Sequence, residues 1–192
     1  MNPHSETQHS NKQLWSALQQ GSKRAFETLY QTHANALLAY GLKITAQQEI
    51  IDDALQDVFI HIWQKREQLP AVENIRAYLL KSLRNRVIRI LESRNLNENG
   101  IQPNQAVQES FEQQLILEEL ADERLHKMYH SIRNLPSRQK EVIHLKFFQN
   151  LTTEEIAALL NINYQSVSNL LYKGIQKMRK QVNGGLLERK TN

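Results

Sequence analysis

Apolar residues recur every three or four positions along nearly the whole chain, and this spacing predicts amphipathic helices. In the first half of the chain we expect four of them, over about residues 14–20, 22–40, 45–69 and 74–92. No segment shows the strict alternation of apolar and polar residues that is typical of a strand. The pattern therefore predicts an all-α fold, and four helices with short connections can form one compact bundle.

Residues at the ends of these segments support the helix boundaries. Gly21 can adopt the positive φ of a helix C-cap, and Ser22 can cap the next helix. Thr45 with Gln48 three residues later has the spacing of a capping box, and Pro70 marks the end of the third helix. The side chains expected to be buried in the first three helices are Leu14, Trp15, Leu18, Phe26, Leu29, Tyr30, Leu37, Ile51, Leu55, Val58, Phe59, Ile62 and Trp63.

The composition changes after the fourth helix. Residues 95–111 are rich in Asn, Gln and Glu and contain Gly100 and Pro103. They lack sustained periodicity, which is typical of a flexible linker. We therefore expect two small helical domains, at residues 10–94 and 112–184, joined by this linker. The second domain is expected to begin with an acidic helix over about 112–134 and to continue with a short helix over 141–148.

The strongest local signal lies near the C-terminus. Thr152 and Glu155 have the spacing of a capping box, and the helix that they start is expected to end at Leu160. A turn follows in which Asn163 can cap a further helix, so the pair is a helix-turn-helix. The stripe of Val167, Leu170, Leu171, Ile175 and Met178 should face inward, which leaves outward Gln165, Ser168, Asn169, Tyr172, Lys173 and Lys177. Short polar groups followed by cations suit a helix in the major groove, although a helical hairpin with a solvated charged face has the same spacing.

The distribution of charge favours a polyanionic partner. Lys and Arg outnumber Asp and Glu by 24 to 20, which gives a formal net charge of +4. Residues 73–94 carry six cations and two acids, residues 138–192 carry nine and four, and the stretch between them is acidic. Two basic segments around an acidic connector indicate two separate contacts with nucleic acid. Either segment alone would also fit a solvated helix face.

Several functional classes are not expected. The chain has no cysteine, its first residues lack the apolar core of a signal peptide, and no apolar run is long enough to span a membrane, so a cytoplasmic location is expected. It has no phosphate-binding glycine loop, nucleophile elbow or metalloprotease motif, which argues against an enzyme. His126 and His130 have the spacing of metal ligands on a helix, but no clear third ligand accompanies them, so neither a metal nor another cofactor is expected.

Four motifs in order resemble the extracytoplasmic-function (ECF) sigma factors. Residues 25–30 (AFETLY) look like the opening helix of that family, and residues 52–63 (DDALQDVFIHIW) are similar to its most characteristic helix. Residues 74–86 (NIRAYLLKSLRNR) resemble the segment that melts and reads the minus-ten element. Residues 135–142 (LPSRQKEV), followed by the helix-turn-helix, look like the minus-thirty-five reader. The resemblance covers about Leu14 to Val182.

The resemblance implies a protein that directs core RNA polymerase to specific promoters. The polymerase β′ clamp helices would be bound by Asp53, Gln56, Asp57, Phe59, Ile60 and Trp63. The minus-ten DNA would be contacted by Asn74, Arg76, Tyr78, Lys81, Arg84 and Asn85, with the pocket for a flipped base in the loop at 69–73. The minus-thirty-five DNA would be contacted by Gln165, Ser168, Asn169, Tyr172, Lys173 and Lys177, in a domain that also seats on the β flap.

The resemblance carries two further implications. Relatives are commonly held inactive by an anti-sigma factor, so such a partner is expected here. The sequence QSVSN at 165–169 followed by Tyr172 and Lys173 resembles a variant of the Bacteroidota, and Asn or Gln favours adenine. Two other classes remain open on the residues alone: a helix-turn-helix regulator that acts without being a polymerase subunit, and an adaptor that binds only proteins.

Overall fold

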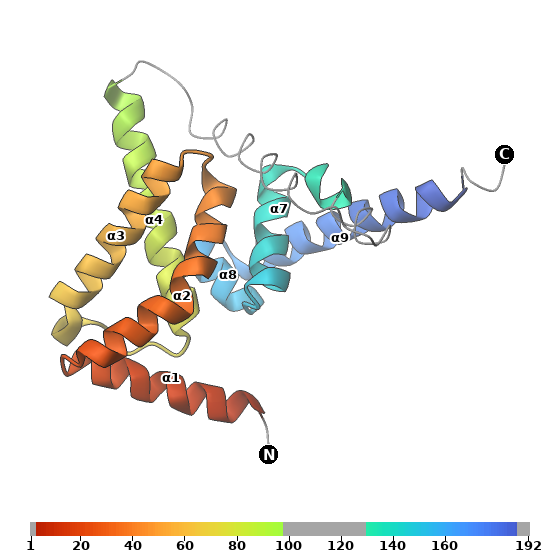
Figure 1. Cartoon of the computed structure of the whole chain (residues 1–192). Helices are drawn as coiled ribbons and strands as arrows, with labels where there is room; N and C mark the ends of the chain where they lie inside the picture. Colours follow the sequence, from red (N-terminus) through yellow and green to blue (C-terminus); the bar gives the residue numbers. More distant parts are fainter. Residues whose placement is uncertain (1–2, 98–129, 188–192) are drawn as a thin grey trace. The chain divides into compact units, whose positions relative to one another are not determined.

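The computed structural model describes residues 3–97 and 130–187, with side chains over 11–94 and 130–181 (Figure 1). All regular elements within these ranges are helical, which confirms the predicted all-α class. The chain divides into two compact units, residues 1–106 and 107–192. The linker predicted at 95–111 and most of the acidic helix predicted at 112–134 lie outside the described residues, so the proposed domain boundaries stay predictions.

The first unit is a bundle of α1 (Pro3–Gln19), α2 (Lys23–Ile44), α3 (Gln48–Gln64) and α4 (Ile75–Asn97), with a short 3-10 turn η1 (Arg66–Gln68) after α3. Helices α2, α3 and α4 pack against one another, and α1 packs on α2 and η1. The core is aliphatic apart from Trp15, Tyr40 and Phe59, and Leu18, Leu29, Ile51, Leu79 and Leu83 are completely buried. Burial of this apolar surface is the main force that holds the bundle together.

Two predicted caps are present where expected. Gly21 has φ +87°, and the hydroxyl of Ser22 accepts a hydrogen bond from the backbone N–H of Ala25 at the start of α2. These two residues fix the turn between α1 and α2. The end predicted at Pro70 for the third helix is wrong: α3 ends at Gln64, and only the 3-10 turn η1 lies between it and Pro70.

Helix α1 begins at Pro3 instead of near residue 14, and three other details of the first unit also differ from the sequence prediction. Helix α2 continues to Ile44 instead of ending near Tyr40, because Gly41 allows α2 to approach Ile51 of α3 closely and this packing offsets the low helix propensity of glycine. The capping box at Thr45 is absent: Gln47 is the N-cap residue of α3, and Thr45 accepts a hydrogen bond from the Gln47 N–H instead. Tyr30 was expected in the core but is 46% exposed.

The second unit contains α7 (Ser137–Ile143), a π-helical turn η3 (His144–Phe148), α8 (Thr153–Leu160) and α9 (Tyr164–Leu187). The helix predicted over 141–148 begins earlier, at Ser137, because the Pro136 carbonyl accepts from the N–H groups of Gln139 and Lys140. Helix α9 packs on both α7 and α8. Gly174 lies against Ile143, so α9 passes close to α7.

Candidate nucleic-acid and protein interfaces

An aromatic cluster lies where α2 meets α3. Phe26 of α2 contacts Phe59 and Trp63 of α3, with ring centroids 6.0 and 5.2 Å apart, and Tyr30 contacts Phe59 at 4.8 Å. These rings and Ile60 line a groove of about 670 Å³. Ile60 is 45% exposed although it is a large aliphatic residue. An apolar groove with exposed Tyr and Ile side chains has the composition of a protein-binding surface.

The residues predicted to bind polymerase are not all equally accessible. Asp53, Gln56 and Ile60 are exposed, Asp57 and Trp63 are half-buried, and Phe59 is only 4% exposed. Phe59 is therefore the buried member of the aromatic cluster and offers little surface to a partner. Tyr30 and Phe26, which the sequence prediction assigned to the core, line the same groove. Their exposure depends on how α2 packs on α3, which no local sequence signal reveals.

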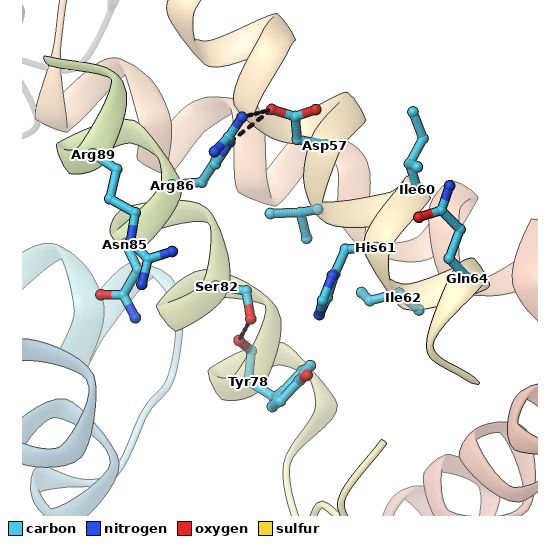
Figure 2. Close-up of a pocket in the computed structure, with 11 residues that line it drawn as sticks. Asp57, Ile60, His61, Ile62, Gln64, Tyr78, Ser82, Asn85, Arg86 and Arg89 are labelled. Carbon is cyan, nitrogen blue, oxygen red and sulfur yellow. Dashed lines mark hydrogen bonds and ion pairs between the residues drawn. The ribbon is translucent and has the colours of Figure 1, made fainter. Parts of the chain in front are cut away.

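A second groove, of about 510 Å³, runs between α3 and α4 (Figure 2). Its polar lining includes Asp57 and His61 from α3 and Tyr78, Ser82, Asn85, Arg86 and Arg89 from α4. Arg86 donates hydrogen bonds through Nε and Nη2 to Oδ2 of Asp57, with an Nε–Oδ2 distance of 2.6 Å. The two side chains are 45% and 42% exposed, so this ion pair adds little to stability. The ion pair does hold the guanidinium of Arg86 at the edge of the groove.

The structure brings together only part of the predicted minus-ten set. Tyr78 and Asn85 line the α3–α4 groove, whereas Arg76, Lys81 and Arg84 are not among its lining residues. Asn74 is the residue before α4, and its side-chain oxygen accepts a hydrogen bond from the Ala77 N–H. Arg86 and Arg89 do line the groove and were not predicted. Arg86 lies four residues after Ser82 and Arg89 four residues after Asn85, and this helical spacing is the signal that could have placed them on this face.

Tyr78 is half-buried at one end of this groove. Its ring meets that of Trp15 edge to face, with centroids 5.3 Å apart and an interplanar angle of 71°. Burial raises the pKa of the Tyr78 hydroxyl, with the nearby Ser82 hydroxyl acting in the opposite direction. The side chain is therefore a neutral phenol at physiological pH, and it can stack on a base or donate a hydrogen bond.

The helix-turn-helix of the second unit has the local structure that the sequence predicts. The Thr152 hydroxyl accepts from the Glu155 N–H, and the Glu155 carboxylate accepts from the Thr152 N–H at 2.8 Å, so the capping box is complete. Asn161 ends α8 in the left-handed conformation, with φ 54°. Asn163 accepts from the Ser166 N–H at 2.7 Å and so caps α9.

Five of the six α9 residues in the predicted minus-thirty-five set are exposed. They are Gln165, Asn169, Tyr172, Lys173 and Lys177, and Tyr172 is 66% exposed. Ser168 is half-buried. The Gln165 side chain donates to Oδ1 of Asn169 at 3.3 Å, which holds the two amides side by side. Lys177 donates through Nζ to the Asn134 carbonyl at 2.8 Å, so it connects α9 to the segment before α7.

The described parts of the chain offer no other obvious chemistry. They contain no group of three or more His, Asp or Glu residues placed to hold a metal ion. Of the predicted histidine pair, His126 lies outside the described residues, and His130 is exposed and within hydrogen-bonding distance of the Asn134 side chain. Within the described ranges, no helix combines the length and apolar character needed to cross a membrane.

Two family models match the chain, one in each unit. The model for sigma-70 region 2 matches residues 29–96, which include α3, α4 up to residue 96, the α3–α4 groove and the lining of the aromatic groove except Phe26. The model for sigma-70, region 4, matches residues 125–178, which include the helix-turn-helix. Together the two matches cover more than half of the chain, in the order expected for a sigma factor.

Two curated proteins of Bacillus subtilis (strain 168) are similar over most of their length. RNA polymerase sigma factor SigZ is 25% identical over 161 residues, which are 82% of this chain and 87% of SigZ. ECF RNA polymerase sigma factor SigX is 23% identical over 164 residues, 83% of this chain and 84% of SigX. Both relatives are matched across both units.

Two solved structures have a similar fold. The sigma factor RpoE, in complex with the anti-sigma factor NepR from Bartonella quintana, has a TM-score of 0.58 at 16% identity and covers 82% of this chain and 96% of its own. CnrH, in complex with the cytosolic domain of CnrY, has a TM-score of 0.59 at 18% identity and covers 90% and 97%. The motifs, the matched regions and the relatives agree: this chain belongs to the sigma-70 family of transcription initiation factors and is an ECF sigma factor.

Proposed function

We propose that the first unit of this sigma factor binds core RNA polymerase through one side of α3 and promoter DNA through the other. The observation that carries this proposal is that α3 contributes to both grooves: the aromatic groove with α2 and the arginine-lined groove with α4. A sigma factor must hold polymerase and promoter at the same time. One helix that contributes to both surfaces can join the two contacts without a flexible connection.

The aromatic groove is the proposed site for the β′ clamp helices. Exposed Ile60 and Tyr30 and half-buried Trp63 supply apolar area, while Asp52 and Gln56 supply polar groups around them. Asp53 is exposed on α3 but is not among the residues that line the groove. Interfaces combine a few large apolar anchors with a polar rim in this way. Phe59 is buried and packs against the ring of Tyr30.

The α3–α4 groove is the proposed site for the minus-ten element. Arg86 and Arg89 can neutralise strand phosphates, and Tyr78 and Asn85 can hold an unstacked base. Lys81, which is exposed on α4 outside the groove, can add to the phosphate contacts. The free energy of binding the melted strand in this groove then favours promoter opening.

In the second unit, α9 is the proposed reader of the minus-thirty-five element. Gln165, Asn169 and Tyr172 are the base-contacting candidates near its N-terminal end, and Lys173 is the first phosphate contact. The ammonium of Lys177 binds the Asn134 carbonyl, which supports a role in orienting α9. The proposed partners also include the β flap for this unit, from the resemblance to ECF sigma factors, and an anti-sigma factor for the chain, as the RpoE–NepR complex suggests. With these partners, the protein acts in the cytoplasm and itself catalyses no reaction in this proposal.

Run-off transcription tests the proposal. Core polymerase is combined with this protein on promoters taken from upstream of its own operon. We expect transcripts that require the protein and that fall by tenfold or more when Tyr172 and Lys173 are both changed to Ala. The matched control is Lys180→Ala, an exposed cation farther along the same helix. Binding to promoter DNA without any association with core polymerase would instead identify a helix-turn-helix regulator.

Polymerase binding is tested separately. Tyr30→Asp places a charge in the aromatic groove alone and should weaken association with core polymerase at least tenfold, while Gln31→Asp, an exposed change at the next position of α2 outside the groove, should not. Equal affinities for the two variants would show that the aromatic groove is not the polymerase site.

A further inference from the structure

Helix α1 is joined to the loop that precedes α4, and none of the roles above uses this connection. The loop consists of residues 69–74, between η1 and α4. The Trp15 indole donates from Nε1 to the Pro70 carbonyl at 2.9 Å. The Gln19 side chain donates from Nε2 to the Leu69 carbonyl at 2.8 Å. Two consecutive carbonyls of the loop are therefore held by side chains that lie 55 and 50 residues earlier in the sequence.

Trp15 also connects the loop to the α3–α4 groove. Its ring packs edge to face against Tyr78, which lines one end of that groove. Trp15 is only 3% exposed, and Leu69 and Ile75 at the two ends of the loop are also buried. One rigid side chain thus contacts both the loop backbone and the aromatic residue proposed to receive a base.

Helix α1 is itself well fixed, which makes it a firm support. Leu18 is completely buried, and the Ser22 N–H donates to the Ala17 carbonyl across the turn that starts α2. Directly before the loop, Arg66 of η1 stacks on the Trp63 ring, with 4.9 Å from Cζ to the ring centroid, and donates a hydrogen bond to the Trp63 carbonyl at 2.8 Å. The loop is therefore held by side chains of α1, and it follows η1, which Arg66 fixes to the end of α3.

We propose that Trp15 and Gln19 are positioning residues that hold the 69–74 loop and Tyr78 in the arrangement that captures one unstacked base of the promoter strand. This inference rests on the proposed minus-ten role of the α3–α4 groove. Taking a base out of its stack costs a few kcal/mol, and a site that is already ordered adds no ordering cost of its own. A loop without these hydrogen bonds would have to be ordered at each capture.

Each variant removes one hydrogen-bond donor, and Gln19→Met also nearly keeps the volume of the side chain, whereas Trp15→Phe makes it smaller. Trp15→Phe keeps an aromatic ring beside Tyr78 and removes the Nε1 donor. Gln19→Met keeps the chain length and removes the Nε2 donor, and it is the safer variant because Gln19 is only half-buried. Gln20→Met, an exposed change at the next position, is the matched control.

The readout is the affinity of holoenzyme for the non-template strand of a promoter found by run-off transcription. Labelled oligonucleotides carry the intact minus-ten sequence or a single abasic site at each position in turn. Wild-type holoenzyme should lose affinity most strongly at one abasic position. On the intact strand each variant should bind about fivefold more weakly, since a neutral hydrogen bond is worth on the order of 1 kcal/mol and 1.4 kcal/mol is tenfold.

On the strand that lacks the captured base, wild type and variants should bind equally, because the base through which Trp15 and Gln19 act is gone. A variant that weakens binding equally at every abasic position would indicate a general loss of structure and would overturn the inference. So would variants that bind the intact strand as wild type does. Wild-type holoenzyme that binds all strands alike would contradict the proposed minus-ten role itself, a result distinct from both.

Discussion

His33 should make the first unit sensitive to mild acid. Its side chain lies in α2 and is 6% exposed, and neither ring nitrogen has a hydrogen-bond partner among the described residues. Burial, with a smaller contribution from the charge of Arg76, lowers the pKa of His33 from its ordinary 6.5 to about 4. The folded protein therefore holds this imidazole neutral at a pH where the unfolded chain would protonate it.

The sign and size of the effect follow from this difference in pKa. Between pH 6.5 and 4 the unfolded state binds more protons than the folded state, so stability falls as pH falls through this window. From pH 7 to pH 5 the free energy of unfolding should drop by about 2 kcal/mol, and near pH 4 the loss should reach about 3 kcal/mol. The loss at pH 5 is a large part of the stability of a typical domain, which is about 5–15 kcal/mol.

The two tryptophans, Trp15 and Trp63, both lie in the first unit, so urea unfolding followed by tryptophan fluorescence reports on that unit alone. The comparison variant is His33→Leu, which removes the titrating group and two unpaired polar atoms. Wild type should lose about 2 kcal/mol more than this variant between pH 7 and pH 5. Arg76→Gln should reduce the difference only slightly, because burial is the larger cause. Equal losses in wild type and His33→Leu would refute the reasoning.

Three further changes test other parts of the structure. Gly41→Ala should destabilise the first unit by roughly 1–2 kcal/mol in the same fluorescence assay, since overpacking against Ile51 outweighs the gain in helix propensity; unchanged stability would show that α2 and α3 can separate slightly. Thr152→Ala should lower the stability of the second unit by about 1 kcal/mol in thermal unfolding followed by circular dichroism, and no change would contradict the capping role. Asp57→Asn should cost less than about 1 kcal/mol in urea unfolding because its ion pair with Arg86 is exposed, and a larger loss would mean that the pair is structural.

The sequence alone determined the helix-turn-helix almost to the residue. Its boundaries depend on capping interactions between residues three positions apart, as at Thr152 and Asn163, and such local interactions need no tertiary context. The sigma-factor family was also predictable, because its motifs occur in the expected order. The capping box predicted at Thr45 shows where local reasoning fails: its spacing was suitable, but Gln47 is the N-cap residue of α3.

The tertiary structure decided which side chains meet across helices. Arg86 is paired with Asp57, 29 residues earlier, and Trp15 supports a loop 55 residues later. Tyr30 is exposed beside Phe59, although its helical spacing suited the core. Periodicity tells which face of a helix is apolar, but the partner of each side chain depends on how the helices cross and how closely residues such as Gly41 let them approach. That information lies in the packing of the whole bundle, because no local segment of the chain contains both members of such a pair.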